Sequence, residues 1–137
     1  MNGYKHIEET IGRYIGGNYK KTVEVGFGGR FTAASIICGM GGSVLCTDIR
    51  PFTSSGGIPT AVDDIDDPDI SLYKGSDCIY AIRPGIEMIP GLLALAERVG
   101  SDLLVYHLGN EIYENGGEII DCGVILHRYY ASEREER

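Results

Sequence analysis

Residues 21–48 constrain the fold more than any other part of the chain, because they predict two strands with one helix between them. The run KTVEV at 21–25 and the run SVLCTD at 43–48 are short and rich in apolar and β-branched residues. Between them, a glycine-rich turn leads into a helical segment at 30–40. Two strands joined by a crossover helix lie parallel in one sheet, with a right-handed connection. The run at 43–48 is apolar enough to be buried on both faces, as parallel strands are.

The alternation of strand and helix continues along the chain and predicts a parallel α/β sheet. The further strands are expected within 58–65, 76–85 and 101–109, and the further helices at 66–75 and 85–100. Asp67 is expected to cap the first of these helices, with Pro68 as its first residue. Gly100 is expected to end the second.

The two ends of the chain depart from this alternation. The segment HIEETIGRYI at 6–15 has its apolar residues on one helical face and predicts a leading helix within 1–17, stopped by a glycine pair. Residues 117–130 contain two β-type runs and predict an antiparallel hairpin, and 131–137 form a charged tail. The sequence therefore predicts one Rossmann-like domain over 1–137, a three-layer sandwich with a mostly parallel sheet and a C-terminal hairpin.

Charge and cysteine content restrict the function. The net charge of −8 argues against a broad nucleic-acid-binding face, which needs clustered Lys and Arg, so a small-molecule ligand is expected. No apolar run or leader indicates a membrane partner, and a cytoplasmic protein is expected. The four cysteines lack a C-x-x-C pair and are expected to be reduced, buried thiols rather than a zinc site or a disulfide framework. A homo-oligomer is left open.

Candidate ligand-binding residues lie at the predicted strand ends. In an open parallel sheet, ligands bind outside the carboxyl ends of the strands, where the strand order reverses. Gly26 and Gly28 would let the backbone approach a ligand, and the next helix offers free N–H groups. Asp48 ends the second strand 22 positions after Gly26, where a carboxylate that binds ribose hydroxyls is expected. The alternative is a purely structural turn, with Asp48 capping the segment after it.

An acidic run at 63–69 follows the third strand. One carboxylate, Asp63 or Asp64, is expected near the base of a nucleoside, and the others are expected to be solvated or to cap the next helix. The spacing is not that of a calcium loop, so no metal site is predicted.

Taken together, these motifs resemble those of a known superfamily. VEVGFGG at 23–29, TD at 47–48, VDD at 62–64 and DCIYAIRPG at 77–85 are similar, in this order, to the ligand-binding motifs of Rossmann-like class I S-adenosylmethionine-dependent methyltransferases. The short length and the IRP after the fourth strand resemble, more narrowly, a family of small uncharacterised archaeal proteins with a methyltransferase-like core. The resemblance implies S-adenosylmethionine as the cofactor. The residues it implies are Glu24, Gly26 and Gly28 beside the methionine moiety, Asp48 at the ribose, and Asp63 or Asp64 at the adenine.

The chain also departs from the superfamily pattern. Arg30 stands where a further glycine is usual. Arg83 and the two residues after it replace the Asn or Asp followed by two prolines of amino-methylating members, which argues against N-methylation of a base or amide. Together with Arg50, these arginines could converge as anion or acceptor contacts, because Arg binds carboxylate and phosphate in bidentate fashion. Alternatively, they pair with Asp48 and the acidic run.

His107, at the end of the fifth strand, could act as a base at the site or be purely structural. Tyr80 and Tyr106 are expected in the core. Three functions remain open from the sequence: a methyltransferase of unknown acceptor, a non-catalytic nucleoside-binding module, and an NAD-binding protein. The missing third glycine disfavours the last, because that glycine lets helix and strand pack closely behind a pyrophosphate.

Overall fold

A seven-stranded sheet forms the centre of the molecule in the computed structural model, which describes residues 3–133. The strands lie in the order β3-β2-β1-β4-β5-β7-β6. They are β1 (Lys21–Val25), β2 (Ser43–Asp48), β3 (Thr60–Val62), β4 (Cys78–Ile82), β5 (Asp102–Tyr106), β6 (Glu118–Asp121) and β7 (Ile125–Tyr130). Strands β1 to β5 pair in parallel, and β7 pairs antiparallel with both β5 and β6. The predicted fold class is confirmed.

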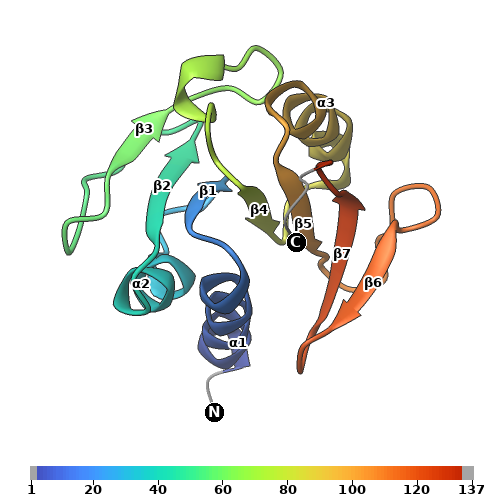
Figure 1. The fold of residues 1–137 in the computed structure, drawn as a ribbon, viewed down its shortest axis with the longest axis horizontal. Helices are drawn as coiled ribbons and strands as arrows, with labels where there is room; N and C mark the ends of the chain where they lie inside the picture. The colour runs from blue at the N-terminus through green and yellow to red at the C-terminus, as the bar shows by residue number, and fades with distance from the viewer. Residues whose placement is uncertain (1–2, 134–137) are drawn as a thin grey trace.

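Helices cover both faces of the sheet (Figure 1). The helical segments are α1 (Gly3–Asn18), α2 (Thr32–Gly39) and α3 (Ile89–Val99), with short 3-10 turns η1 (Ile70–Leu72) and η2 (Ile86–Met88). Helices α1 and α2 lie on one face and α3 on the other. Successive side chains of a strand point to opposite faces, so β1 sends Val23 and Val25 toward α3. The alternate residue, Glu24, therefore points toward α1 and α2.

Two local predictions were wrong. Helix α1 does not end at its glycine pair but continues to Asn18. Gly16 lies within the helix because it allows close packing: a Cβ at this position would lie 2.8 Å from Met40 Sδ. The expected helix capped by Asp67 is only the turn η1, and the side chain of Asp69 caps it by accepting the Ser71 N–H. The Asp67 N–H instead closes a turn onto the carbonyl oxygen of Asp64.

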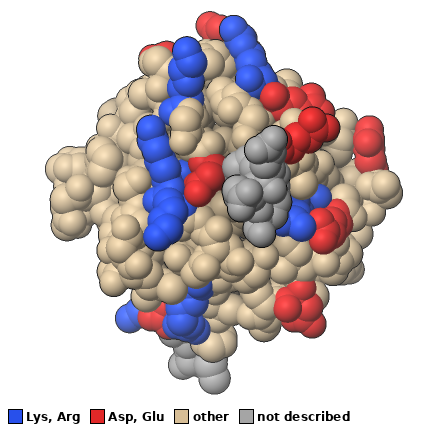
Figure 2. Space-filling model, viewed as in Figure 1, with Lys and Arg blue, Asp and Glu red and all other residues tan. Residues whose placement is uncertain are grey.

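The surface and the cysteines complete the description. Cys46 and Cys78 are buried as expected, whereas Cys38 is exposed and Cys122 is half-buried; all four thiols are free. The face in Figure 2 shows Lys and Arg interspersed with Asp and Glu rather than joined in a continuous basic surface. None of the helices within residues 3–133 is long and apolar enough to cross a membrane. Most of the charged tail, residues 134–137, lies outside the described residues.

Candidate functional site

A cavity of about 460 Å³ lies at the carboxyl ends of the parallel strands. It sits where the strand order reverses: β2 and then β3 lie on one side of β1, and the chain then crosses from β3 to β4 on the other side of β1. Its lining residues are Val25, Gly26, Gly28, Asp48, Ile49, Arg50, Asp63, Asp64, Ile65, Asp66, Arg83, Pro84, Gly85, Glu87 and Met88. The cavity thus brings together candidate ligand-binding residues that the sequence places at the ends of four different strands.

The glycine loop after β1 is joined directly to Asp48 at the end of β2. The backbone N–H of Gly28 donates to Asp48 Oδ2 at 2.9 Å, and the N–H of Arg50 donates to Oδ1 at 3.0 Å. Gly26 and Gly28 have φ angles of 69° and 63°, which other residues rarely adopt. A Cβ added at Gly28 would meet nothing within 4 Å, so there is open space beside this glycine.

The two carboxylates after β3 line the same cavity but differ in how firmly they are held. Asp63 accepts the N–H of Asp69 at Oδ1 (2.9 Å) and the hydroxyl of Tyr73 at Oδ2, so it ties the following loop to the core. Asp64 accepts the N–H of Asp66 at Oδ1 and is exposed. Asp64 is therefore the less constrained of the two candidates for a base contact.

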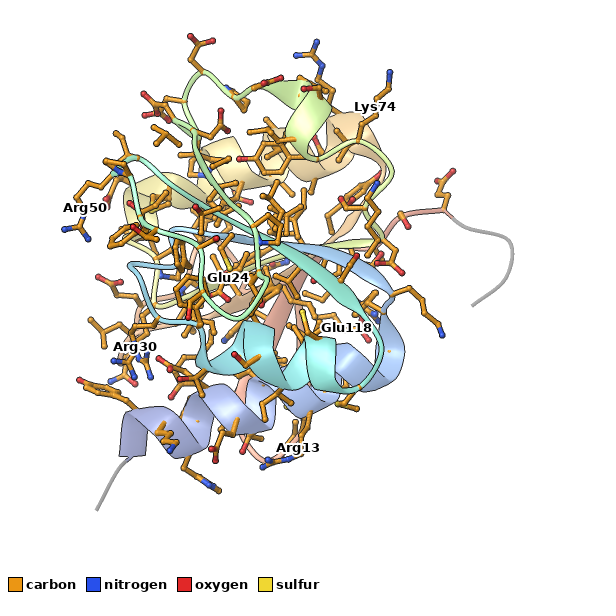
Figure 3. All side chains as sticks on the ribbon, turned by 90° about the vertical axis from the view of Figure 1, so that its left-hand side faces the viewer. Arg13, Glu24, Arg30, Arg50, Lys74 and Glu118 are labelled. Atoms are coloured by element: carbon orange, nitrogen blue, oxygen red, sulfur yellow. The ribbon has the colours of Figure 1, made fainter. Side chains whose placement is uncertain are left out.

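Glu24 is not brought to the cavity. The residue is 3% exposed, and its carboxyl group lies on the side of the sheet that faces α1 and α2 and accepts the Tyr80 hydroxyl at 2.8 Å (Figure 3). Burial raises the pKa of Glu24 to about 8, although the Tyr80 hydrogen bond opposes this; the nearby charge of Glu8 adds to the rise. Tyr80 itself is in the core, as expected, whereas Tyr106 is only half-buried.

Two of the three candidate arginines converge on an acidic residue that sequence reasoning missed. Arg30 donates from Nε and Nη2 to the two carboxylate oxygens of Glu8, at 2.8 and 3.0 Å, and Arg83 Nη1 donates to the same carboxylate at 3.0 Å. Burial raises the pKa of Glu8, but the hydrogen bonds from the two arginines outweigh it, and the net shift is downward. Glu8 lies on the buried face of α1 together with Ile11 and Ile15, which follow it by three and seven positions. This helical spacing is the signal in the sequence from which the burial of Glu8 could have been predicted.

The three arginines differ in what they offer a ligand. Arg30 does not line the cavity, and Arg50 lies exposed at the edge of the molecule, with Nε 3.9 Å from Asp48. Arg83 lines the cavity, has a strained φ of 56°, and places its guanidinium over the rings of Tyr4 and Tyr106 at 4.3 and 5.6 Å. Its Nη2 is buried and has no hydrogen-bond partner among residues 3–133.

His107 lies apart from this cavity. It lines a second one together with His127, a residue that sequence reasoning did not single out.

Comparison with known proteins places the chain in a family. The model described as "Uncharacterised protein family (UPF0146)" matches residues 7–119. The chain belongs to the UPF0146 family. A UPF0146 protein of Archaeoglobus fulgidus is 36% identical over 106 residues, covering 76% of this chain and 81% of the relative. A relative in Pyrococcus horikoshii is 33% identical over 128 residues, covering 90% of this chain and 96% of the relative. The resemblance to small archaeal proteins is confirmed.

Solved structures share the fold at low sequence identity. A SAM-dependent methyltransferase from Archaeoglobus fulgidus matches with a TM-score of 0.59 at 15% identity, covering 79% of this chain and 54% of its own. The MycE methyltransferase of mycinamycin biosynthesis, solved with Mg and SAH, gives 0.56 at 12% identity, covering 98% and 48%. MoeE5, solved with UDP-glucuronic acid and NAD, gives 0.50 at 14% identity, covering 62% and 36%. The chain thus spans about half or less of these proteins, and its fold is that of the Rossmann-like class I methyltransferases.

Proposed function

We propose that this UPF0146 protein binds S-adenosylmethionine in the strand-end cavity and transfers its methyl group to an acceptor. The observation that carries the proposal is Asp48, a carboxylate at the switch point of the sheet, held in place by the N–H of Gly28 at 2.9 Å. A carboxylate has about four lone-pair sites, so Asp48 can keep its two backbone donors and still accept two ribose hydroxyls. The glycine loop in front of it leaves room for that sugar.

The other cavity residues fit the two ends of the same ligand. Ile49, Ile65 and Met88 provide an apolar wall for adenine, beside Asp64 as a polar contact. At the opposite end, Arg83 lines the cavity and offers a cation for the carboxylate of the methionine moiety. When bound, the sulfonium of the cofactor supplies an electrophilic methyl group, and the protein contributes chiefly position and orientation.

Charge favours this ligand over a dinucleotide. The residues lining the cavity include five carboxylates (Asp48, Asp63, Asp64, Asp66 and Glu87) against two arginines. An excess of negative charge attracts a sulfonium cation and repels the two charges of a pyrophosphate. In addition, Phe31 stands three positions after Gly28, where the dinucleotide fingerprint has its third glycine. The site is therefore better suited to S-adenosylmethionine than to NAD.

Isothermal titration with S-adenosylmethionine, S-adenosylhomocysteine and NAD tests the binding step. We expect both sulfur nucleosides to bind and NAD not to bind. Asp48→Asn should weaken their binding at least about tenfold, because hydrogen bonds to a charged group contribute about 1.5–3 kcal/mol each. Asp67→Asn is the matched control, since Asp67 is exposed and outside the cavity, and should stay within about twofold. Tighter binding of NAD, or equal binding by Asp48→Asn, would contradict the assignment.

Methyl transfer is tested separately. Purified protein is incubated with methyl-labelled S-adenosylmethionine and a small-molecule extract, with Asp48→Asn as the negative control. Label in a new product, and its loss in the variant, are expected. Saturable S-adenosylhomocysteine binding with no labelled product would instead identify a non-catalytic binding module.

A further inference from the structure

Glu8 on α1 is the one hydrogen-bond acceptor that the guanidinium of Arg83 has among residues 3–133. Glu8 Oε2 accepts Arg83 Nη1 at 3.0 Å. The Arg83 side chain is 16% exposed and that of Glu8 is 4% exposed, so water competes little for this contact. The ion pair therefore fixes where the positive charge of Arg83 lies.

The surroundings of Arg83 hold it in a conformation that an unconstrained residue avoids. Its φ of 56° lies in the left-handed region, and its backbone N–H donates to the carbonyl oxygen of Tyr106 at 2.7 Å. Such strain persists only where neighbouring groups enforce it, and it is frequent at ligand sites. The guanidinium also lies over the rings of Tyr4 and Tyr106, which restrict its plane but offer no acceptor along its edge. Glu8 therefore anchors that edge.

The Glu8 carboxylate is itself held by Arg30. Arg30 Nε and Nη2 donate to its two oxygens at 2.8 and 3.0 Å, and the Arg30 side chain is 51% exposed. Arg30 thus compensates the charge of Glu8 from the solvent side and fixes the carboxylate that Arg83 contacts. The cluster of one carboxylate and two guanidiniums keeps a net positive charge, and of the three residues Arg83 lines the strand-end cavity.

Loss of the Glu8 charge has two opposite effects on an anionic ligand at this cavity. It removes a negative charge that repels the ligand, and it releases Arg83. The repulsion is small because Arg30 already pairs with both oxygens of Glu8. Release is the larger effect, because a guanidinium that is mostly shielded from water and has lost its acceptor is strongly destabilised where it stands. The long Arg side chain then turns its charge toward water and away from the ligand.

We propose that Glu8 is a positioning residue, which holds the guanidinium of Arg83 where it binds the carboxylate of an amino-acid-bearing nucleoside. The inference rests on the proposed function, because it concerns the methionine end of the same ligand. It makes the site selective for nucleosides that carry a carboxylate. It also makes that selectivity depend on the docking of α1, a helix that contributes no lining residue to the strand-end cavity.

Isothermal titration with S-adenosylhomocysteine and with its decarboxylated form tests this role, because the two compounds differ only in the carboxylate. The wild type should bind S-adenosylhomocysteine at least about tenfold more tightly. Glu8→Gln should lower this preference at least about fivefold and leave the affinity for the decarboxylated form within about twofold. Glu9→Gln removes the same charge from the next position of α1 and, as the matched control, should keep the preference of the wild type. Arg83→Gln should abolish the preference, and Glu8→Gln should then change it no further.

The outcomes separate this inference from the proposed function. If neither compound binds the wild type, both are wrong. If the wild type prefers S-adenosylhomocysteine and Glu8→Gln keeps or increases that preference, only the role of Glu8 is wrong. An additional loss caused by Glu8→Gln in the Arg83→Gln background would likewise show that Glu8 does not act through Arg83.

Hydrogen exchange of the wild-type protein gives a second test, which does not depend on the folding of Glu8→Gln. Coupling between two sites is reciprocal, so a carboxylate that binds better when α1 is docked also stabilises the docked helix. At saturation, S-adenosylhomocysteine should slow the exchange of α1 amides at least about fivefold more than its decarboxylated form does. Equal exchange of these amides in the two complexes would overturn the proposal.

Discussion

Replacing Glu24 by Gln should remove a pH dependence of stability that the wild-type protein carries. Glu24 is buried beneath α1 and α2, and its Oε1 accepts the Tyr80 hydroxyl. Gln keeps an oxygen at this place but does not ionise. The variant therefore separates the effect of the buried charge from the effect of the hydrogen bond.

The sign and size of this pH dependence follow from the pKa of Glu24, which rises from 4.5 to about 8 on folding. Between these values the unfolded chain has lost the Glu24 proton while the native state retains it. The native state binds more protons, so the free energy of unfolding falls as pH rises through this window. At 1.36 kcal/mol per unit, the full shift corresponds to a loss of roughly 5 kcal/mol.

Urea unfolding followed by far-UV circular dichroism measures this loss, since the chain has no Trp for fluorescence. The free energy of unfolding of the wild type should fall steadily from about pH 5 to about pH 8, and that of Glu24→Gln should change far less over the same range. Glu97→Gln, at an exposed position of α3, is the control and should follow the wild type. Parallel pH profiles for the wild type and Glu24→Gln would refute the buried, protonated state of Glu24.

Two further predictions concern the packing of α1. Glu8→Gln should destabilise the protein by about 2–4 kcal/mol at pH 7, because it leaves the charges of Arg30 and Arg83 uncompensated. Urea unfolding at several pH values should show that this difference in the free energy of unfolding shrinks as the pH falls below 4.5 toward the lowered pKa of Glu8, because protonation then removes the same charge from the wild type. A difference that stays constant with pH would contradict this. Gly12→Ala should lower the midpoint of thermal unfolding, because the new Cβ would lie 2.8 Å from a carbonyl oxygen of α2. Gly17→Ala, with its nearest neighbour 4.0 Å away, should raise that midpoint, and the opposite order would refute the close approach of α1 to α2.

The strands nearest the site were predictable residue by residue. Strands β1 and β2 run over the residues expected from the sequence, because each is an apolar run bordered by glycine: Gly26 follows β1 and Gly42 precedes β2. Asp48 and Asp63 lie at the cavity because each stands at the carboxyl end of a predicted strand. Besides the glycine pair that does not end α1, the local prediction failed where several acidic residues compete for one turn. There Asp67 closes a turn with Asp64 and leaves the capping of η1 to Asp69.

Contacts between distant segments could not be predicted from one sequence. Glu8 is followed by a second glutamate, and nothing local shows that its arginine partners lie 22 and 75 positions away. His127 likewise gains its meaning only when the hairpin brings it to His107. Glu24 is different, because strand alternation already places it on the face opposite Val23 and Val25. Its expected place beside the methionine moiety stays a prediction, although Glu24 does not line the strand-end cavity.

The hydrogen bond between Glu8 and Arg83 joins the first helix to the end of the fourth strand, across 75 positions of the chain. A contact with this separation closes a long loop, so it forms late relative to the shorter crossover through α2 that links β1 to β2. Native-state hydrogen exchange can reveal the converse event. Transient release of α1 would expose the backbone amides of α2 and free the guanidinium of Arg83, while the central strands stay protected. The geometry at the carboxyl ends of β1 and β4 would then depend on how often the amino-terminal helix undocks.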